Sequence, residues 1–235
     1  MHFVISDIHG ELDKLKTLLK KIHFSDRDEL YILGDVVDRG PNPIKTLQFL
    51  MSFPNVTCIV GNHEVMAMVC LKFLEEEITD DSIDELSVER FEQYIDWILN
   101  GASVTIDEFS ALSAEEREEI IDFLGEFVAY EELNINGQEY LLVHAGIDHF
   151  SEEKPLDEYS LEDFVWSRID YETPYYEDKI VVSGHTPTQA IPGNPRPGYI
   201  YRTNNHIAID CGACHSDGRL AAICLESGEE FYSDC

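Results

Sequence analysis

The sequence predicts an α/β fold in which helices flank two β-sheets. Short apolar runs with the length of buried strands recur along the chain. Amphipathic helical patterns separate the first of these runs, and such strand–helix–strand alternation is typical of a parallel sheet. The later runs follow one another with little helix between them. We therefore expect a largely parallel first sheet and a second, more antiparallel sheet.

Six strands are expected along the chain: Phe3–Ser6, Leu30–Leu33, Val56–Val60, Tyr140–Val143, Ile180–Ser183 and Ile207–Ile209. A closing hairpin is expected around Gly228, formed by the runs Leu220–Leu225 and Glu230–Tyr232. The first helix has apolar residues at helical spacing, namely Leu12, Leu15, Leu18, Leu19 and Ile22. The second begins near Pro43, because proline suits the first turn of a helix.

Residues 73–127 differ from the rest of the chain, because they are very acidic and mostly helical in pattern. Acidic runs recur within them at 75–77, 80–81, 115–116 and 118–119. An apolar stripe is expected on one helix, formed by Phe91, Tyr94, Ile95 and Ile98. We interpret this segment as a solvated helical insertion within a single domain that spans residues 1–235. The alternative is a cap that helps to select substrates.

The charge balance narrows the partners that we expect. The 235 residues include 47 acidic and 16 basic ones, for a formal net charge of −31. Such a surface repels nucleic acid and anionic lipid, so neither is an expected partner. The N-terminal run MHFVISDIHG lacks the basic region and long apolar stretch of a signal peptide. We therefore expect a cytoplasmic protein. A phosphate ester would approach only where bound divalent metal ions reverse the local field.

Five of the expected strands end in polar residues of the kinds that bind metal ions. These clusters begin at Asp7, Asp35, Asn62, His144 and His185. Ligands bind beyond the carboxyl ends of the strands in open α/β sheets, so we expect the five clusters to converge. Carboxylate, imidazole and amide groups suit manganese, iron or zinc. Cys211 and Cys214 have the spacing of half a zinc site, but the sequence has no second such pair, and we favour a structural role.

Taken in order, these clusters resemble the phosphoprotein phosphatase family of calcineurin-like metallophosphoesterases, above all its short bacterial and phage serine/threonine protein phosphatases. The motifs are Asp-x-His-Gly at 7–10, Gly-Asp-x-Val-Asp-Arg-Gly at 34–40, Gly-Asn-His-Glu at 61–64, His-Ala-Gly at 144–146 and Gly-His-Thr at 184–186. A further signature, Trp-x-x-Asn-Gly-Ala-x-x-Thr at 97–105, has Ala102 where a second glycine is usual, and Ser6 replaces another frequent glycine. The resemblance implies a central β-sandwich flanked by helices.

The resemblance also implies a ligand set for two divalent metal ions. Asp7 and His9 would bind the first ion, and Asp35 would bridge both ions. Asn62, His144 and His185 would complete the coordination shell of the second ion. Manganese is the expected ion in vitro, with iron and zinc as alternatives.

The same resemblance implies in-line attack on phosphorus by a hydroxide that bridges the two metals. His63 would be the general acid that protonates the leaving alkoxide, and Asp38 would orient and charge it. Arg39 would grip the phosphate with its planar guanidinium, assisted by Asn62. A second arginine would be Arg168, in the stretch Trp-Ser-Arg at 166–168.

The expected function is that of a metal-dependent phosphomonoesterase, because His185 is followed by threonine and proline rather than by the second histidine of many phosphodiesterases. We expect a protein serine/threonine phosphatase, with a symmetrical dinucleoside tetraphosphate hydrolase as the alternative. Glu64 favours the former, since the dinucleotide hydrolases that resemble this family more often have aspartate there. The net charge favours it too, because a polyanionic nucleotide is repelled more strongly than a phosphopeptide with basic residues.

A third possibility is a catalytically silent binding protein with the same fold. It predicts that a metal ligand or His63 is missing, whereas the sequence has all of them. The expected substrate is therefore a phosphorylated protein or a small phosphoester, and the sequence leaves the oligomeric state open.

Overall fold

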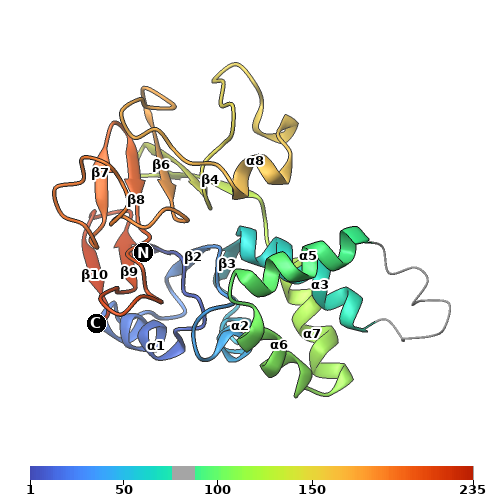
Figure 1. The fold of residues 1–235 in the computed structure, drawn as a ribbon. Coiled ribbons are helices and arrows are strands. Elements are labelled where there is room, and N and C mark those ends of the chain that lie inside the picture. Colours follow the sequence, from blue (N-terminus) through green and yellow to red (C-terminus); the bar gives the residue numbers. More distant parts are fainter. Residues whose placement is uncertain (76–87, 235) are drawn as a thin grey trace.

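The structure is a computed structural model that describes residues 1–75 and 88–234. The acidic residues at 76–77 and 80–81 of the expected insertion lie outside this part. Two five-stranded sheets lie at the centre, and helices flank them (Figure 1). The predicted α/β class with two sheets and flanking helices is therefore confirmed.

The first sheet has the strand order β10-β9-β1-β2-β3. β1 pairs in parallel with β2, and β2 with β3, whereas β9 pairs antiparallel with both β1 and β10. The bounds of these strands are β1 His2–Ile5, β2 Glu29–Leu33, β3 Val56–Ile59, β9 Ala221–Cys224 and β10 Glu230–Tyr232. The predicted C-terminal hairpin thus extends this sheet beside the N-terminal strand.

The second sheet has the strand order β4-β5-β6-β8-β7. Its strands are β4 Tyr130–Ile135, β5 Gln138–Val143, β6 Lys179–Ser183, β7 Tyr201–Thr203 and β8 His206–Ala208. β5, β6 and β8 run parallel, and β4 and β7 add antiparallel edges. Each sheet thus has two parallel and two antiparallel strand pairs, and the expectation of a more antiparallel second sheet is wrong.

The physical reason for this difference lies in the connection from β5 to β6. A parallel pair needs a crossover of a dozen or more residues, which is usually a long helix. Here the crossover is a largely irregular segment that contains only a 3-10 turn at Leu156–Glu158 and the short helix α8 (Leu161–Val165). The sequence does not predict β4 or β7, because these edge strands are rich in polar residues.

Side chains that alternate along the strands form separate apolar layers, because successive residues of a strand point to opposite faces. In β1, Val4 packs between the two sheets, while Phe3 and Ile5 pack towards the helices. In β5, Leu142 packs between the sheets and Leu141 packs on the opposite face. These strands are covered on both faces, which is why they appear in the sequence as continuous apolar runs.

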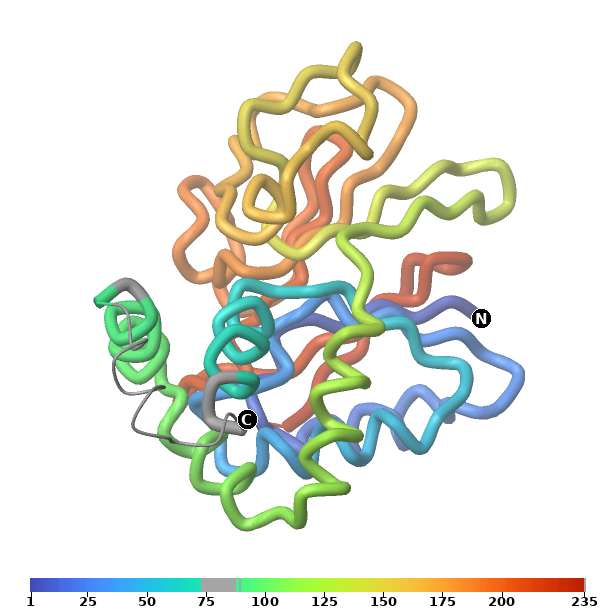
Figure 2. The backbone as a smooth tube through the Cα atoms, turned by 90° about the vertical axis from the view of Figure 1, so that its right-hand side faces the viewer, coloured from blue at the N-terminus to red at the C-terminus, as the bar shows by residue number. Residues whose placement is uncertain are grey.

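The helices of the first half pack on the outer face of the first sheet. They are α1 Leu12–Lys21, α2 Pro43–Met51, α3 Asn62–Glu75, α5 Val88–Leu99, α6 Ser103–Ser110 and α7 Ala114–Gly125. α3 packs against α5 and α7, and α2 packs against α6 and α7. Figure 2 shows this half, in blue and green, on one side of the molecule and the second sheet with its loops, in yellow and orange, on the other.

The apolar stripe expected on α5 is only half buried. Tyr94 and Ile98 pack against the core and Trp97 is fully buried, whereas Phe91 and Ile95 are exposed. The buried face is therefore rotated towards Trp97, which the stripe did not include.

Among the residues that the structure describes, no helix is long and apolar enough to span a bilayer.

Candidate metal and phosphoester site

The five polar clusters of the sequence meet at one edge of the two sheets. Backbone hydrogen bonds tie the loops together: the N–H of Asp7 donates to Gly34, and that of His9 donates to Asp35. In the second sheet, the N–H of Gly184 donates to the carbonyl of His144 over 2.7 Å. Each loop continues a parallel strand, so the carboxyl ends of these strands set the place of the site.

The backbone at this edge is strained. Eleven described non-glycine residues have a positive φ, a region that L-residues avoid. Six of these eleven are residues of the expected site, namely Asp7, His9, Asp35, Asp38, Arg39 and His185. Such conformations cost roughly 1–3 kcal/mol each and persist only where the surrounding structure enforces them. Their concentration here is typical of a functional site.

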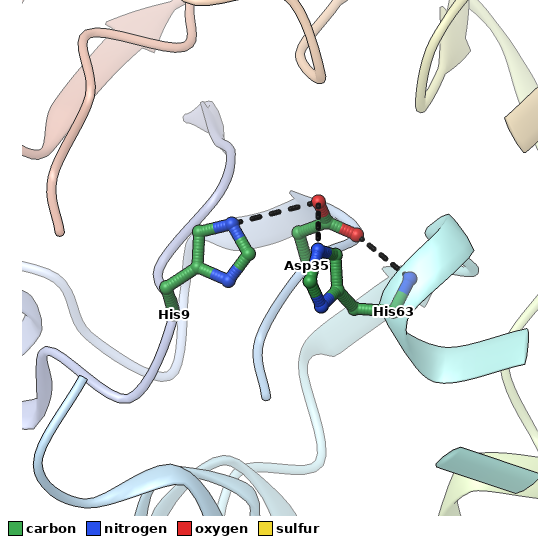
Figure 3. Close-up of side chains that lie close together, drawn as sticks. All are labelled: His9, Asp35 and His63. Atoms are coloured by element: carbon green, nitrogen blue, oxygen red, sulfur yellow. Dashed lines mark hydrogen bonds and ion pairs between the residues drawn. The ribbon is translucent and has the colours of Figure 1, made fainter. Parts of the chain in front are cut away.

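One group of side chains able to hold a metal ion is formed by His9, Asp35 and His63 (Figure 3). The Nε2 of His9 lies 3.6 Å from the Oδ2 of Asp35, and the Nε2 of His63 lies 3.9 Å from the same oxygen. The backbone N–H of His63 also donates to Oδ1 of Asp35 over 3.2 Å. All three side chains are buried.

A second group able to hold a metal ion is formed by Asp35, His144 and His185, so Asp35 belongs to both groups. The side-chain oxygen of Asn62 lies 3.0 Å from Nε2 of His144 and 3.0 Å from Nδ1 of His185. His144 Nδ1 lies 2.7 Å from the carbonyl of Leu33, which can only accept, so the proton of a neutral imidazole is on Nδ1.

This tautomer provides a test of whether a cation fits the site. With its proton on Nδ1, His144 directs a lone pair from Nε2 at the oxygen of Asn62, which is also an acceptor. A cation between these two buried acceptors would relieve their mutual repulsion. His9 has the same tautomer, because its Nδ1 donates to Val37 over 2.8 Å and leaves Nε2 as an acceptor that can bind a cation.

The pKa values of the histidines agree with this conclusion. Burial lowers the pKa of His9 to about 3, although Asp35 acts in the opposite direction. Burial and the neighbouring His144 lower the pKa of His185 to about 3. Burial would raise the pKa of Asp35, but the surrounding imidazoles outweigh it and lower that pKa. The site thus combines neutral imidazoles with an ionised carboxylate, which is the state of metal ligands.

Asp7 lies beside these groups but outside both of them. Its carboxylate accepts the backbone N–H of His185 and the hydroxyl of Ser6. Burial, and then repulsion by Asp210 and Asp35, raise the pKa of Asp7 well above its ordinary value. Three buried carboxyl groups so close together would be relieved by a cation.

The expected acid, His63, is held by a chain of buried hydrogen bonds. Its Nδ1 lies 2.6 Å from Oδ2 of Asp38, and neither side chain is exposed. Asp38 also accepts from the indole of Trp97 over 2.8 Å and from the hydroxyl of Thr105 over 2.5 Å. Burial lowers the pKa of His63, but Asp35 and Asp38 outweigh burial, so its pKa lies above the ordinary value.

The expected phosphate-binding arginines lie at the mouth of the site. Exposed Arg39 donates from Nη1 to Nε2 of His9 (2.8 Å) and from Nη2 to Nε2 of His63 (2.9 Å). Arg168 is exposed and donates to Thr186 over 3.2 Å, next to His185. The structure thus brings together all the residues that the sequence singles out for this site.

Several supporting residues are not assigned a role from the sequence. Trp97 and Thr105 hold Asp38, and the carbonyls of Asn100 and Gly101 accept from the side chain and backbone of Arg39. A Cβ on Gly101, whose φ is +104°, would lie 2.8 Å from Cγ of Arg39, so glycine is required. All four are named positions of the Trp-x-x-Asn-Gly-Ala-x-x-Thr signature, which could have indicated their role from the sequence.

Glu64 supports the site by accepting hydrogen bonds from its backbone. Its fully buried carboxylate accepts the backbone N–H of Asp35 (2.7 Å), Val36 (2.8 Å) and Gly61 (2.9 Å), and so joins the loop after β2 to the start of α3. Burial, and then Asp35, raise the pKa of Glu64 to about 7, although these donors favour its ionised form.

Comparison with known proteins agrees with this geometry. The chain is 37% identical over 109 residues to a protein of Buchnera aphidicola subsp. Schizaphis graminum named symmetrical bis(5'-nucleosyl)-tetraphosphatase, covering 45% of this chain and 40% of that protein. It is 28% identical over 149 residues to a protein of Pseudomonas fluorescens with the same name, covering 62% of this chain and 42% of that protein. The chain thus matches about two fifths of the length of these relatives.

Solved structures share the fold at low sequence identity. A structure described as a putative diadenosine tetraphosphatase superposes with a TM-score of 0.65 at 17% identity, covering 98% of this chain and 91% of that one. A protein serine/threonine phosphatase from Saccharomyces cerevisiae superposes with a TM-score of 0.56 at 13% identity, covering 100% of this chain and 79% of that one.

The family follows from the length of the match. The model of the calcineurin-like phosphoesterases matches residues 3–221, a span that includes both groups able to hold a metal ion and both arginines. The chain belongs to the calcineurin-like phosphoesterase family and is a metallophosphoesterase.

Proposed function

We propose that this protein hydrolyses dinucleoside tetraphosphates symmetrically and releases two nucleoside diphosphates. The observation that carries the proposal is the similarity to relatives named for this activity. The site is compatible with it, because exposed Arg39 and Arg168 flank the buried acceptors and can hold neighbouring phosphates. This proposal takes the place of the protein phosphatase that the sequence favours.

The proposed roles of the side chains follow from their contacts. Divalent metal ions, held by Asp7, His9, Asp35, Asn62, His144 and His185, would activate water and neutralise phosphate charge. Arg39 and Arg168 bind phosphate oxygens, and Arg39 then leaves Nε2 of His63. His63 can carry a proton on that nitrogen and deliver it to the departing oxygen. Asp38 accepts from Nδ1 and keeps the ring in place.

A protein serine/threonine phosphatase is the second candidate. The formal net charge of −31 favours it, since a phosphopeptide with basic residues meets less repulsion than a polyanionic nucleotide. Glu64 no longer discriminates between the two functions. It is fully buried and occupied by backbone N–H groups, so it cannot contact either substrate.

Direct competition between the two substrate classes tests the proposal. With manganese present, we expect a higher kcat/KM for diadenosine tetraphosphate than for a phosphoserine peptide, and ADP as the nucleotide product. A higher kcat/KM for the phosphopeptide would reverse the order of the two candidates. Formation of ATP and AMP would show that cleavage is not symmetrical.

A further inference from the structure

A groove of about 240 Å³ lies between helices α3 and α5, next to the phosphoester site. The α3 wall is apolar and is formed mainly by Val65, Met66 and Val69. The side chain of Trp166 lines it as well and is 48% exposed. An aromatic ring and aliphatic side chains therefore face solvent beside a site that binds phosphate.

The opposite wall is polar. α5 presents Gln93 and Asp96 to the groove, at i and i+3 of one helix face, and Asn100 lines it directly after the helix ends. By contrast, the apolar residues Phe91 and Ile95 of the same helix are exposed. A groove with one apolar and one hydrogen-bonding wall suits a flat ring that has apolar faces and a polar edge.

Three contacts place the groove beside the reaction site, on the side of His63. α3 begins with Asn62 and His63, and the groove is lined by the turns that follow. The carbonyl of Asn100 accepts from Nε of Arg39 over 3.4 Å. The ring of Trp166 lies edge-on to His185, with 6.3 Å between centroids. A group attached to the leaving oxygen, which His63 faces, would extend into this groove.

We propose that this groove binds the nucleobase of the departing nucleotide and prefers adenine to guanine, a proposal that rests on the proposed dinucleotide hydrolysis. Bases stack on aromatic side chains, which places the ring against Trp166. Adenine offers an amino group and a ring nitrogen on one edge, which asparagine and glutamine can bind together. In that same orientation the carboxylate of Asp96 can accept from the adenine amino group, whereas guanine presents an oxygen at this position.

Product binding tests the proposal without turnover. The protein has two tryptophans, of which Trp166 lines the groove, so a change in fluorescence that ADP causes and pyrophosphate does not cause reports on Trp166. We expect ADP to change the fluorescence and to bind several-fold more tightly than GDP. Inorganic pyrophosphate, which has no base, should compete with ADP and leave the fluorescence unchanged. Equal affinities for ADP, GDP and pyrophosphate would overturn the proposal.

Two substitutions locate the effect. Trp166→Ala should raise the KM for diadenosine tetraphosphate about tenfold relative to that for inorganic tripolyphosphate, and Trp166→Phe should restore most of it. Asp96→Asn should reduce the ratio of ADP affinity to GDP affinity. The negative charge of Asp96 repels the diphosphate of both nucleotides equally, so this repulsion does not change the ratio. Asp107→Asn removes the same charge from exposed α6 and should leave that ratio unchanged.

The outcomes separate this proposal from the one on which it rests. If diadenosine tetraphosphate is not hydrolysed, the proposed function fails and the nucleobase site fails with it. If it is hydrolysed but the Trp166 and Asp96 variants keep the wild-type KM ratio and base preference, the nucleobase site alone is wrong.

Discussion

At the scale of single residues, His63 could act as a metal ligand or as a general acid, and its contacts bear on the choice. It lies within reach of Asp35 as a metal ligand would, yet its Nδ1 is held 2.6 Å from Asp38 as in an acid–carboxylate pair. Asp38 cannot serve as a free ligand, because Trp97 and Thr105 already donate to it. We therefore expect proton transfer, not metal binding, to depend on His63.

His63→Asn distinguishes these roles. As the general acid, His63 contributes about 10²–10⁴-fold, so kcat should fall by that factor. The metal content, measured by mass spectrometry of the dialysed protein, should stay unchanged. Loss of one metal equivalent would instead make His63 a ligand. His149→Asn is the matched control, because the His149 side chain is 93% exposed and its Nε2 lies 3.6 Å from Oδ2 of Asp148 on the surface.

At the scale of elements, the insertion helices hold the loop that carries Asp38 and Arg39. α6 supplies Thr105, whose hydroxyl donates to Asp38 and accepts the backbone N–H of Asp38 over 3.0 Å. The turn before α6 supplies Gly101, whose carbonyl accepts the N–H of Arg39 over 3.0 Å. The segment expected as an insertion therefore contacts the loop of Asp38 and Arg39 directly.

Thr105→Val tests this brace. The change keeps the shape of the side chain but removes two hydrogen bonds to Asp38, so we expect kcat to fall roughly tenfold while the metal content is kept. Thr46→Val is the matched control, since Thr46 is also fully buried and its hydroxyl donates to Asn42 over 2.7 Å. An equal loss of kcat in both variants would show a general effect of buried threonines.

Glu64 on α3 braces the same loop from the other side. In Glu64→Gln the amide nitrogen would face backbone N–H groups of Asp35, Val36 or Gly61, leaving buried donors without an acceptor. We expect the free energy of unfolding to fall by about 2–3 kcal/mol in urea titrations. Glu116→Gln, in the exposed cap of α7, should lower the free energy of unfolding much less. Similar losses in the two variants would argue against the brace.

At the scale of the whole molecule, both sheets contribute to one site, so metal binding should stabilise the entire fold. Ions at about a hundred times their Kd contribute about 2.7 kcal/mol, which is roughly 5–10 °C in Tm for a chain of this size. Chelation should lower the Tm by that amount in calorimetry. Asp35→Asn, which weakens both groups, should be nearly insensitive to the chelator. The same shift in this variant would place the stabilising ions elsewhere.

The two ends of the described chain are joined by Glu226, whose carboxylate accepts the N–H of His2 over 2.9 Å and lies 2.7 Å from its Nδ1. Burial would raise the pKa of Glu226, but these bonds outweigh it and lower the pKa to about 2. A depressed carboxyl pKa stabilises the fold above the unfolded value near 4.3, and this contribution is lost as the pH falls towards 2.

Glu226→Gln should therefore cost about 1–2 kcal/mol at pH 7 and progressively less between about pH 4 and pH 2. Urea unfolding of both proteins at pH 7 and at pH 3 measures the difference. A cost that is constant with pH would mean that the charge of Glu226 contributes nothing.

The sequence by itself determined the buried strands and the residues at their ends. Both are local properties: a strand buried on two faces is a continuous apolar run, and metal-binding side chains are recognisable by type. The five clusters were therefore predictable together with the two-sheet α/β class, and the family model confirms the class of enzyme. The helices that begin near Leu12 and Pro43 were also predictable from local sequence, by apolar spacing and by proline in the first turn.

Only the tertiary structure decided how the strands are ordered and which residues support the site. The second sheet is mixed because a long irregular segment makes the crossover between β5 and β6, and neither feature leaves a periodic pattern. The roles of Glu64 and Thr105 depend on partners 29 and 67 residues away in sequence. The groove between α3 and α5 likewise exists only when both helices are packed, because contacts between distant residues are set by packing and not by local propensity.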